Sequence, residues 1–436
     1  MMDIKEFDEI RPYESGEMKQ AFNDLLNDRQ FSVRLKGFVP WLPKSLRNGL
    51  LKLAFIGVKT PLDFQMRFMK PIVWHIVHKH SDGLVFDDSN LECRTESVEF
   101  ATAQPSSAES ISVENSTLYT LNSKFDKRYT FVSNHRDIVL DSAFLDVLLV
   151  KAGYPTTVEI GIGDNLLIYP WIKTLVRMNK AFTVRRGLTA HEMMRSSQLM
   201  SRYIHYAVTQ KRENIWIAQR EGRAKDSSDH TQDAVLKMLA MGGPLIENGE
   251  FSTLNSQWIN SIKELNIVPL TISYEFDPCD YLKAQEFQQK RDNPDFKKSR
   301  QDDLDNMKTG IFGYKGRVRY TCAAPINTWI DELSDLPKTE WFKALAERMD
   351  REIYRGYVLY PCNYIAYDML MEQGNHNSQF STLNSQFYTP ADVERFEQYL
   401  QDQLAKIKIP NKDEAFLRER MLTMYANPVR NYLAAQ

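Results

Sequence analysis

Short apolar runs alternate with longer helical runs between about residues 126 and 326, and this alternation constrains the fold more than any other feature. The runs expected to form strands cover residues 129–133, 156–162, 181–185, 214–218, 267–274 and 317–322. The runs expected to form helices between them cover residues 141–151, 166–178, 191–211 and 231–241. Strands joined through helices run parallel, because the helix carries the chain back to the edge where the previous strand began. The sequence therefore predicts an α/β fold with a mixed or mostly parallel sheet flanked by helices.

The remaining residues are expected to add helical regions on both sides of this core. We predict a basic amphipathic helical region over 1–95, a polar insertion or linker over 96–125, the α/β core over 126–330 and a helical region over 331–436. A further polar insertion is expected near 374–388. Residues 341–371 read as one long helix, and Thr389-Pro390 as the start of another, because proline is favoured at the first helical position.

A short polar motif occurs twice in the chain. Residues 251–257 and 380–386 both read Phe-Ser-Thr-Leu-Asn-Ser-Gln, and residues 120–123 repeat the Thr-Leu-Asn-Ser part. No period of roughly 20–50 residues accompanies these copies, which excludes a solenoid. We expect them to be surface insertions without a catalytic role.

The overall composition excludes several classes of protein. The formal net charge of the 436 residues is −2 at pH 7, which argues against a nucleic-acid partner. The four cysteines, Cys93, Cys279, Cys322 and Cys362, are far apart, which argues against a structural metal or a disulfide framework and favours a cytoplasmic location. No stretch approaches the roughly 20 apolar residues of a membrane-spanning helix, and the first residues carry no apolar signal core.

Residues 33–80 differ from the rest of the chain in charge. They hold nine Lys and Arg residues against one acid, Asp63, and are interleaved with aromatic residues. A basic amphipathic helix of this kind is typical of proteins that lie on an anionic membrane surface. The alternative is a helical lid whose apolar stripe packs on the core while its basic face is solvated.

The pattern around His135 is the most informative for chemistry. His135 directly follows a strand-like run, and Asp137 and Asp141 follow within a few residues. An imidazole titrates near neutral pH and so suits a general base, whereas a carboxylate on its second nitrogen would fix the tautomer. Asp141 starts an apolar helical run, where a carboxylate is favoured, so we expect Asp141 to pair with His135 and keep Asp137 as the alternative acid.

Three further strand ends carry polar or basic residues. Glycines at a strand end let a ligand approach the backbone, a helix N-terminus there favours an anion, and the planar fork of arginine suits phosphate. The carboxyl ends of parallel strands meet at one edge of a sheet, so these residues are expected to share a site with His135. The candidates are Gly163, Asp164 and Asn165, then Arg185 and Arg186, and finally Glu221, Gly222, Arg223 and Lys225.

As an ordered set, these blocks resemble the glycerolipid acyltransferases, in particular the branch that uses glycerol-3-phosphate or dihydroxyacetone phosphate. The matching segments are 135–141, 163–166, 182–186, 221–225 and a strand at 267–274 that contains Pro269. The resemblance covers about residues 126–330. The chain departs from the family pattern twice, since the acid lies one residue farther from the histidine and the Glu-Gly block is one residue shorter.

The resemblance implies transfer of a fatty acyl group from acyl-CoA or acyl carrier protein to glycerol-3-phosphate or 1-acylglycerol-3-phosphate, with no further cofactor. It places the protein in phospholipid synthesis, at the inner face of the cell membrane. Two alternatives remain open, namely the same fold acting on a non-phosphate lipid acceptor, and a non-catalytic protein that binds a membrane surface.

The resemblance also implies a role for each candidate residue. His135 would be the general base, paired with Asp141, and Glu221 would orient an arginine. Pro269 would be structural or would lie along the acyl tunnel. The acceptor hydroxyls would contact Asp164 and Asn165. The acceptor phosphate would be bound by Arg185, Arg186, Arg223 and Lys225.

Overall fold

The computed structural model describes residues 4–38, 43–91, 126–243, 255–374 and 385–436. The polar segment expected over 96–125 lies outside the described residues. The first residues of the two copies of the polar motif, 251–254 and 380–384, also lie outside them.

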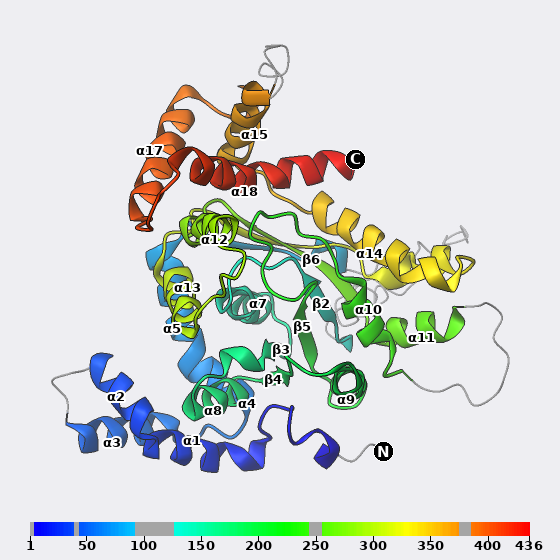
Figure 1. The fold of residues 1–436 in the computed structure, drawn as a ribbon. Helices are drawn as coiled ribbons and strands as arrows, with labels where there is room; N and C mark the ends of the chain where they lie inside the picture. Colours follow the sequence, from blue (N-terminus) through cyan, green and yellow to red (C-terminus); the bar gives the residue numbers. More distant parts are fainter. Residues whose placement is uncertain (1–3, 39–42, 92–125, 244–254, 375–384) are drawn as a thin grey trace, which may run out of the picture.

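A seven-stranded sheet forms the centre of the molecule, with strand order β1-β7-β6-β2-β5-β3-β4 (Figure 1). The strands are β1 (Leu84–Asp87), β2 (Thr130–Ser133), β3 (Val158–Gly163), β4 (Ala181–Val184), β5 (Asn214–Ala218), β6 (Ile267–Tyr274) and β7 (Val318–Cys322). Only the β6–β7 pair is antiparallel among the strand pairs of the described residues. The predicted α/β fold with a mostly parallel sheet is confirmed. Strand β1 was not predicted, since its four residues are too few to show a period.

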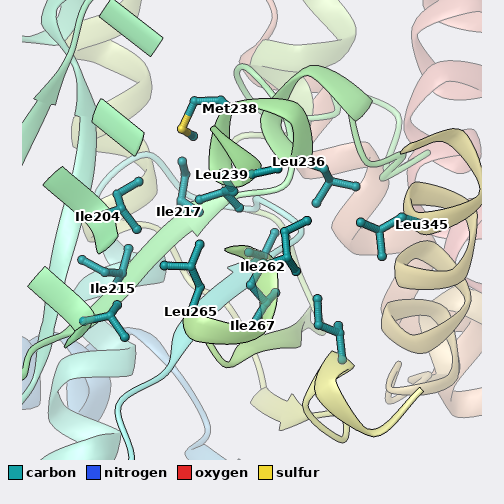
Figure 2. Close-up of a cluster of buried hydrophobic side chains, with 14 of the residues drawn as sticks. Ile204, Ile215, Ile217, Leu236, Met238, Leu239, Ile262, Leu265, Ile267 and Leu345 are labelled. Atoms are coloured by element: carbon teal, nitrogen blue, oxygen red, sulfur yellow. The ribbon is translucent and has the colours of Figure 1, made fainter. Parts of the chain in front are cut away.

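Helices cover both faces of the sheet, because successive side chains of a strand point to opposite faces. Phe131 of β2 packs in one apolar cluster and Val132 in another. The Phe131 face is covered by α5 (Lys70–His80) and α7 (Leu140–Lys151). The Val132 face, part of which is drawn in Figure 2, is covered by α9 (Ala190–Thr209), α10 (Asp233–Ala240), α11 (Ser256–Glu264) and α14 (Lys338–Arg355).

The N-terminal region forms several short helices, so the single helix expected over 33–80 is wrong in extent. They are η1 (Ile4–Phe7), η2 (Ser15–Glu17), α1 (Met18–Asn27), α2 (Arg29–Phe38), α3 (Lys44–Phe55), α4 (Pro61–Phe64) and the π-helical η3 (Gln65–Met69), which leads into α5. The later pieces pack on the core through buried residues such as Phe64 and Val73, as a lid would. Helix α3 and the residue after it, by contrast, leave Leu46, Leu50, Leu53 and Ile56 between 51% and 66% exposed.

The C-terminal region is helical, and its helices α15 (Pro361–Gly374), α17 (Pro390–Lys406) and α18 (Glu414–Ala434) share one apolar cluster with α12 (Asp280–Asp292) of the core. Helix α13 (Arg300–Phe312) instead packs Ile311 against the cluster on the Phe131 face of the sheet. Short 3-10 turns complete the fold, namely η4 (Ser89–Leu91), η5 (Asp164–Leu166), η6 (Ile326–Thr328), η7 (Ile330–Leu333) and η8 (Ser385–Phe387). Within the described residues, no helix combines the length and the apolar character that crossing a bilayer requires.

Of the two helix predictions for this region, one is wrong and one is confirmed. The long helix expected over 341–371 is wrong, because the chain breaks into α14 and α15 between Arg355 and Pro361. Proline lacks a backbone N–H and disfavours a helical residue before it, so a helix begins there more readily than it continues. The predicted start at Thr389 is confirmed, since its side chain accepts from the backbone of Asp392 with Pro390 at the first helical position.

Candidate active site

His135 and Asp141 form a hydrogen-bonded pair at the carboxyl end of β2. His135 Nδ1 lies 2.7 Å from Asp141 Oδ2, which confirms the predicted pairing. The backbone N–H groups of Arg136 and Asp137 donate to the same oxygen at 2.7 and 3.1 Å, and Tyr274 donates to Oδ1 at 3.3 Å. With the Nδ1 proton directed at the carboxylate, a neutral ring keeps its lone pair on Nε2. The pair thus has the geometry of a general base held in one tautomer.

Asp137 caps the turn before α7. Its Oδ1 accepts hydrogen bonds from the backbone N–H groups of Val139 and Leu140, both at 2.8 Å. Burial, together with the nearby Asp141 carboxylate, raises the pKa of Asp137. Asp137, the alternative acid, therefore has a structural role as a cap at the start of α7.

Hydrogen bonds and an ion pair to distant parts of the chain hold the residues on either side of His135. The Asn134 amide bonds both backbone groups of Ile272 in β6, at 2.8 and 3.0 Å. Arg136 Nη2 forms an ion pair of 2.6 Å with Asp229 Oδ2, which also accepts from the Tyr357 hydroxyl at 2.6 Å. The loop that carries His135 is therefore fixed by β6 and by the segment between α14 and α15.

The loops after β3, β4 and β5 are connected to one another. Asp164 Oδ1 accepts from the backbone N–H of Arg186 at 3.2 Å, and Arg186 Nη1 lies 3.0 Å from Glu221 Oε1. A Cβ at Gly163 would lie 2.6 Å from Arg186 Nε, so a larger residue there would displace the Arg186 side chain. Gly222 has a φ of +70°, a backbone conformation that residues with a side chain adopt only with strain. Arg186 and Glu221 are thus held together, as the role expected for Glu221 requires.

The segment after Gly163 does not open a long helix. It forms only the three-residue turn η5, and α8 (Pro170–Met178) begins four residues later. The expectation of a helix N-terminus at Asp164 is therefore wrong, because Pro170 sets the start of the helix and the preceding residues form a loop.

Two cavities meet at His135. The first, which we call the polar chamber, has a volume of about 530 Å³ and is lined by six basic and four acidic side chains. The basic ones are Arg186, Arg220, Arg223, Lys225, Lys283 and Lys298, and the acidic ones are Glu221, Asp226, Glu286 and Asp303. The second, which we call the apolar groove, has a volume of about 270 Å³. Its apolar lining includes Ile138, Ile160, Ile162, Met200, Trp216 and Met238.

The residues common to both cavities define their junction. They are His135, Ile138, Leu166, Arg186, Arg220, Glu221 and Gly222. The His135 ring also lies edge-on to Trp216, with the ring centroids 5.7 Å apart. A group that enters from either cavity therefore reaches the same imidazole.

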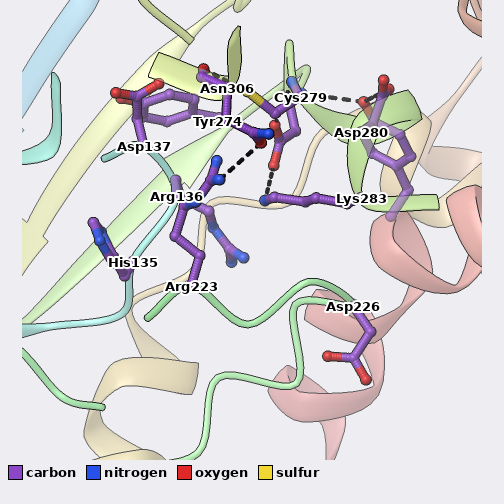
Figure 3. A network of polar contacts seen from close by, with 12 residues as sticks. His135, Arg136, Asp137, Arg223, Asp226, Tyr274, Cys279, Asp280, Lys283 and Asn306 are labelled. Atoms are coloured by element: carbon purple, nitrogen blue, oxygen red, sulfur yellow. Dashed lines mark hydrogen bonds and ion pairs between the residues drawn. The ribbon is translucent and has the colours of Figure 1, made fainter. Parts of the chain in front are cut away.

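The structure brings most of the predicted binding residues to the polar chamber. Arg223 donates to Asn306 Oδ1 at 2.9 Å, and its Nη1 is buried without a hydrogen-bond partner in the described part of the chain (Figure 3). Lys225 forms an ion pair with Glu286, and burial lowers the pKa of Lys225 to about 8 against the effect of that carboxylate. Asn165 also lines the chamber.

Four of the predicted residues do not line the polar chamber. Gly163 lines the apolar groove, and Asp164 lines neither cavity. Arg185 lines the apolar groove and forms an ion pair with Glu9 at the surface. Pro269 is buried within β6, in register with Val132 of β2, and lines neither cavity.

Several chamber residues were not predicted. Lys283, Glu286, Lys298 and Asn306 come from α12, from α13 and from the segment between them, where no motif marks them. Arg220 stands directly before the Glu-Gly block, so its neighbours in sequence could have pointed to it.

Comparison with known proteins gives no guide to the role of this site. No family model matches the chain, and no curated protein does. The function has to follow from the arrangement of the two cavities and the His135–Asp141 pair.

Proposed function

We propose that this protein is an O-acyltransferase that moves a fatty acyl group from a thioester to a hydroxyl of a glycerophosphate-type acceptor. The donor would be acyl-CoA or acyl carrier protein, and the acceptor glycerol-3-phosphate or 1-acylglycerol-3-phosphate. The observation that carries the proposal is the position of the His135–Asp141 pair, at the junction of the apolar groove and the polar chamber. An acyl chain and a polar acceptor need two such cavities that meet at a base.

In the proposed reaction, the acyl chain lies in the apolar groove and the acceptor in the polar chamber. His135 Nε2 takes the proton of the acceptor hydroxyl as its oxygen attacks the thioester carbonyl carbon. The Asp141 carboxylate stabilises the imidazolium that forms. Collapse of the tetrahedral intermediate breaks the carbon–sulfur bond, and the proton on His135 passes to the leaving thiolate.

The charge of the chamber supports an acceptor that carries phosphate. Basic side chains outnumber acidic ones there by six to four, and Arg223 has a buried nitrogen that no described residue satisfies. Arginine and lysine bind phosphate through charge-assisted hydrogen bonds. We assign the phosphate to Arg223 and Lys225, with Arg186 beside them, and leave Arg185 out because it lines the other cavity.

The acidic side chains of the chamber favour one alternative. Glu221, Asp226, Glu286 and Asp303 could pair with an amine, as in a non-phosphate lipid acceptor. The chain would then carry out the same transfer on a different acceptor.

The exposed residues of α3 support a position on a membrane. Leu46, Leu50 and Leu53 recur at helical spacing and are at least half exposed. Residues 29–62 contain basic residues and no acid. An apolar face with a basic surround binds anionic lipid surfaces. The protein would thus act as a peripheral enzyme on the inner, cytoplasmic face of the membrane, where its lipid product belongs.

The decisive experiment is a mass-spectrometric assay of the purified protein with acyl-CoA and a panel of acceptors. The panel contains glycerol-3-phosphate, 1-acylglycerol-3-phosphate, glycerol and lipidated amino acids, and His135→Ala serves as the inactive control. Acyl transfer to a phosphorylated acceptor is the expected result. Transfer to non-phosphate acceptors alone would favour the amine-binding alternative. Vesicle binding without any acyl transfer, from acyl-CoA or acyl carrier protein, would favour a non-catalytic membrane protein.

A further inference from the structure

The junction of the two cavities contains one basic group that the proposed roles leave unused. Its polar side chains are His135, Arg186, Arg220 and Glu221. Arg186 and Glu221 form an ion pair with each other. In the described residues Arg220 has no hydrogen-bond or ion-pair partner, and its Nε is buried. A buried guanidinium nitrogen without a partner is unfavourable, so a ligand group that satisfies it binds at an advantage.

The position of Arg220 limits what that ligand group can be. The side chain borders the apolar groove as well as the polar chamber, next to the histidine proposed as the base. On the groove side, the only polar part of an acyl thioester is its carbonyl. The phosphate of an acceptor has Arg223 and Lys225 in the chamber, and neither of these residues borders the groove.

We propose that Arg220 binds the carbonyl oxygen of the acyl thioester and stabilises the oxyanion of the tetrahedral intermediate. The inference rests on the acyltransferase function proposed above. As the acceptor oxygen bonds to the carbonyl carbon, the carbonyl π electrons move onto oxygen, beside the guanidinium. As the oxyanion re-forms the carbonyl, the carbon–sulfur bond breaks and the thiolate leaves with the proton held by His135. A fixed donor at the atom where charge develops accelerates the step without tighter binding of the ground state.

The test compares Arg220→Gln with the wild-type protein on two acceptors, glycerol-3-phosphate and glycerol. Loss of an oxyanion donor lowers kcat by about 10²–10³-fold. We expect this fall with both acceptors, by a similar factor, with acceptor KM changed by less than about threefold. Arg220→Lys, which keeps the charge, should recover part of kcat. Arg202→Gln is the control, because Arg202 of α9 forms an ion pair with Glu6 and lines neither cavity, and the kcat of this variant should stay within about twofold of the wild type.

Two patterns would overturn the role of Arg220 while leaving the acyltransferase function intact. One is an unchanged kcat in an otherwise active protein. The other is a rise in KM for glycerol-3-phosphate alone, which would make Arg220 a phosphate ligand. If wild-type protein transferred no acyl group to any acceptor, the proposed function would fail and this role with it. Circular dichroism checks the fold, and Arg220→Met replaces Arg220→Gln in the same comparison if the latter is unfolded.

Discussion

At the scale of single residues, the structure gives the two acids near His135 different tasks. Asp141 contacts the imidazole, whereas Asp137 satisfies backbone N–H groups at the start of α7. Asp141→Asn should lower kcat by about 10²–10⁴-fold, because the base loses its orientation and its counter-charge. Asp137→Asn should act on stability, at about 1 kcal/mol, since it weakens a helix cap. Steady-state kinetics and thermal unfolding of both variants measure these effects, and a larger kcat loss for Asp137→Asn would contradict the assignment.

Arg223 provides the second prediction at this scale. Removing a charge-assisted contact costs about 1.5–3 kcal/mol, so Arg223→Ala should raise KM for glycerol-3-phosphate by about tenfold or more. KM for glycerol should stay unchanged, because glycerol has no phosphate to bind. Equal changes for the two acceptors would remove Arg223 from the phosphate site.

Sequence reasoning reached part of the site for a physical reason. His135, Arg186 and Glu221 follow parallel strands and Gly163 ends one, and the carboxyl ends of parallel strands meet at one edge of the sheet. The pattern could not separate Arg185 from Arg186, although neighbouring residues at a strand end point to different sides.

Two lysines of the polar chamber could not be predicted from the sequence, for a different reason. Lys283 and Lys298 arrive at the chamber only through the packing of α12 and α13, and long-range packing has no local signature in the sequence. Comparing the charge of whole helical faces would not have singled them out, because both lie in mixed-charge segments.

At the scale of elements, the segment between α14 and α15 bears on the active site. The Tyr357 hydroxyl donates to Asp229, which is the ion-pair partner of Arg136. Through Asp229, this contact connects the break between α14 and α15, which was not predicted, with Arg136, the residue next to His135. The sequence showed the helical pattern on both sides of the break, but the break itself depends on Pro361 and on contacts with β6, such as Val358 N–H to Ser273 Oγ at 3.1 Å.

Tyr357→Phe tests this connection with a small change. Loss of one hydrogen bond costs about 1 kcal/mol, so the melting temperature should fall by a few degrees. Because the loop around His135 would be held less firmly, kcat should fall several-fold while acceptor KM stays constant. Tyr360→Phe is a useful comparison, since Tyr360 is also buried in this segment but packs in the C-terminal cluster. An equal kcat loss in both variants would show that general destabilisation, and not the Asp229 contact, is responsible.

At the scale of the whole molecule, helix α3 lies in the N-terminal region, at the opposite end of the molecule from α15, α17 and α18 (Figure 1), and its leucines are exposed. The basic composition of 33–80 predicted either a membrane surface or a packed lid, and the structure divides the segment. Residues 61–80 pack against the core, whereas α3 keeps three leucines in solvent. A count of charges cannot distinguish these two parts of the segment. The difference between them depends on which apolar helix face packs against the rest of the protein.

Vesicle co-sedimentation tests the proposed membrane face. The protein should bind vesicles that contain anionic lipid and release them as salt rises, since each basic residue near the surface contributes about 1 kcal/mol and is screened. Leu50→Glu should weaken this binding strongly, because it places a charge in the apolar face and repels the anionic surface. Leu433→Glu is the matched control, as Leu433 is 55% exposed on α18 against 51% for Leu50. Similar losses in both variants, or equal binding to neutral and anionic vesicles, would show that α3 does not form a specific membrane surface. Retained acyl transfer by Leu50→Glu on a soluble acceptor such as glycerol-3-phosphate would then separate membrane binding from the chemistry at His135.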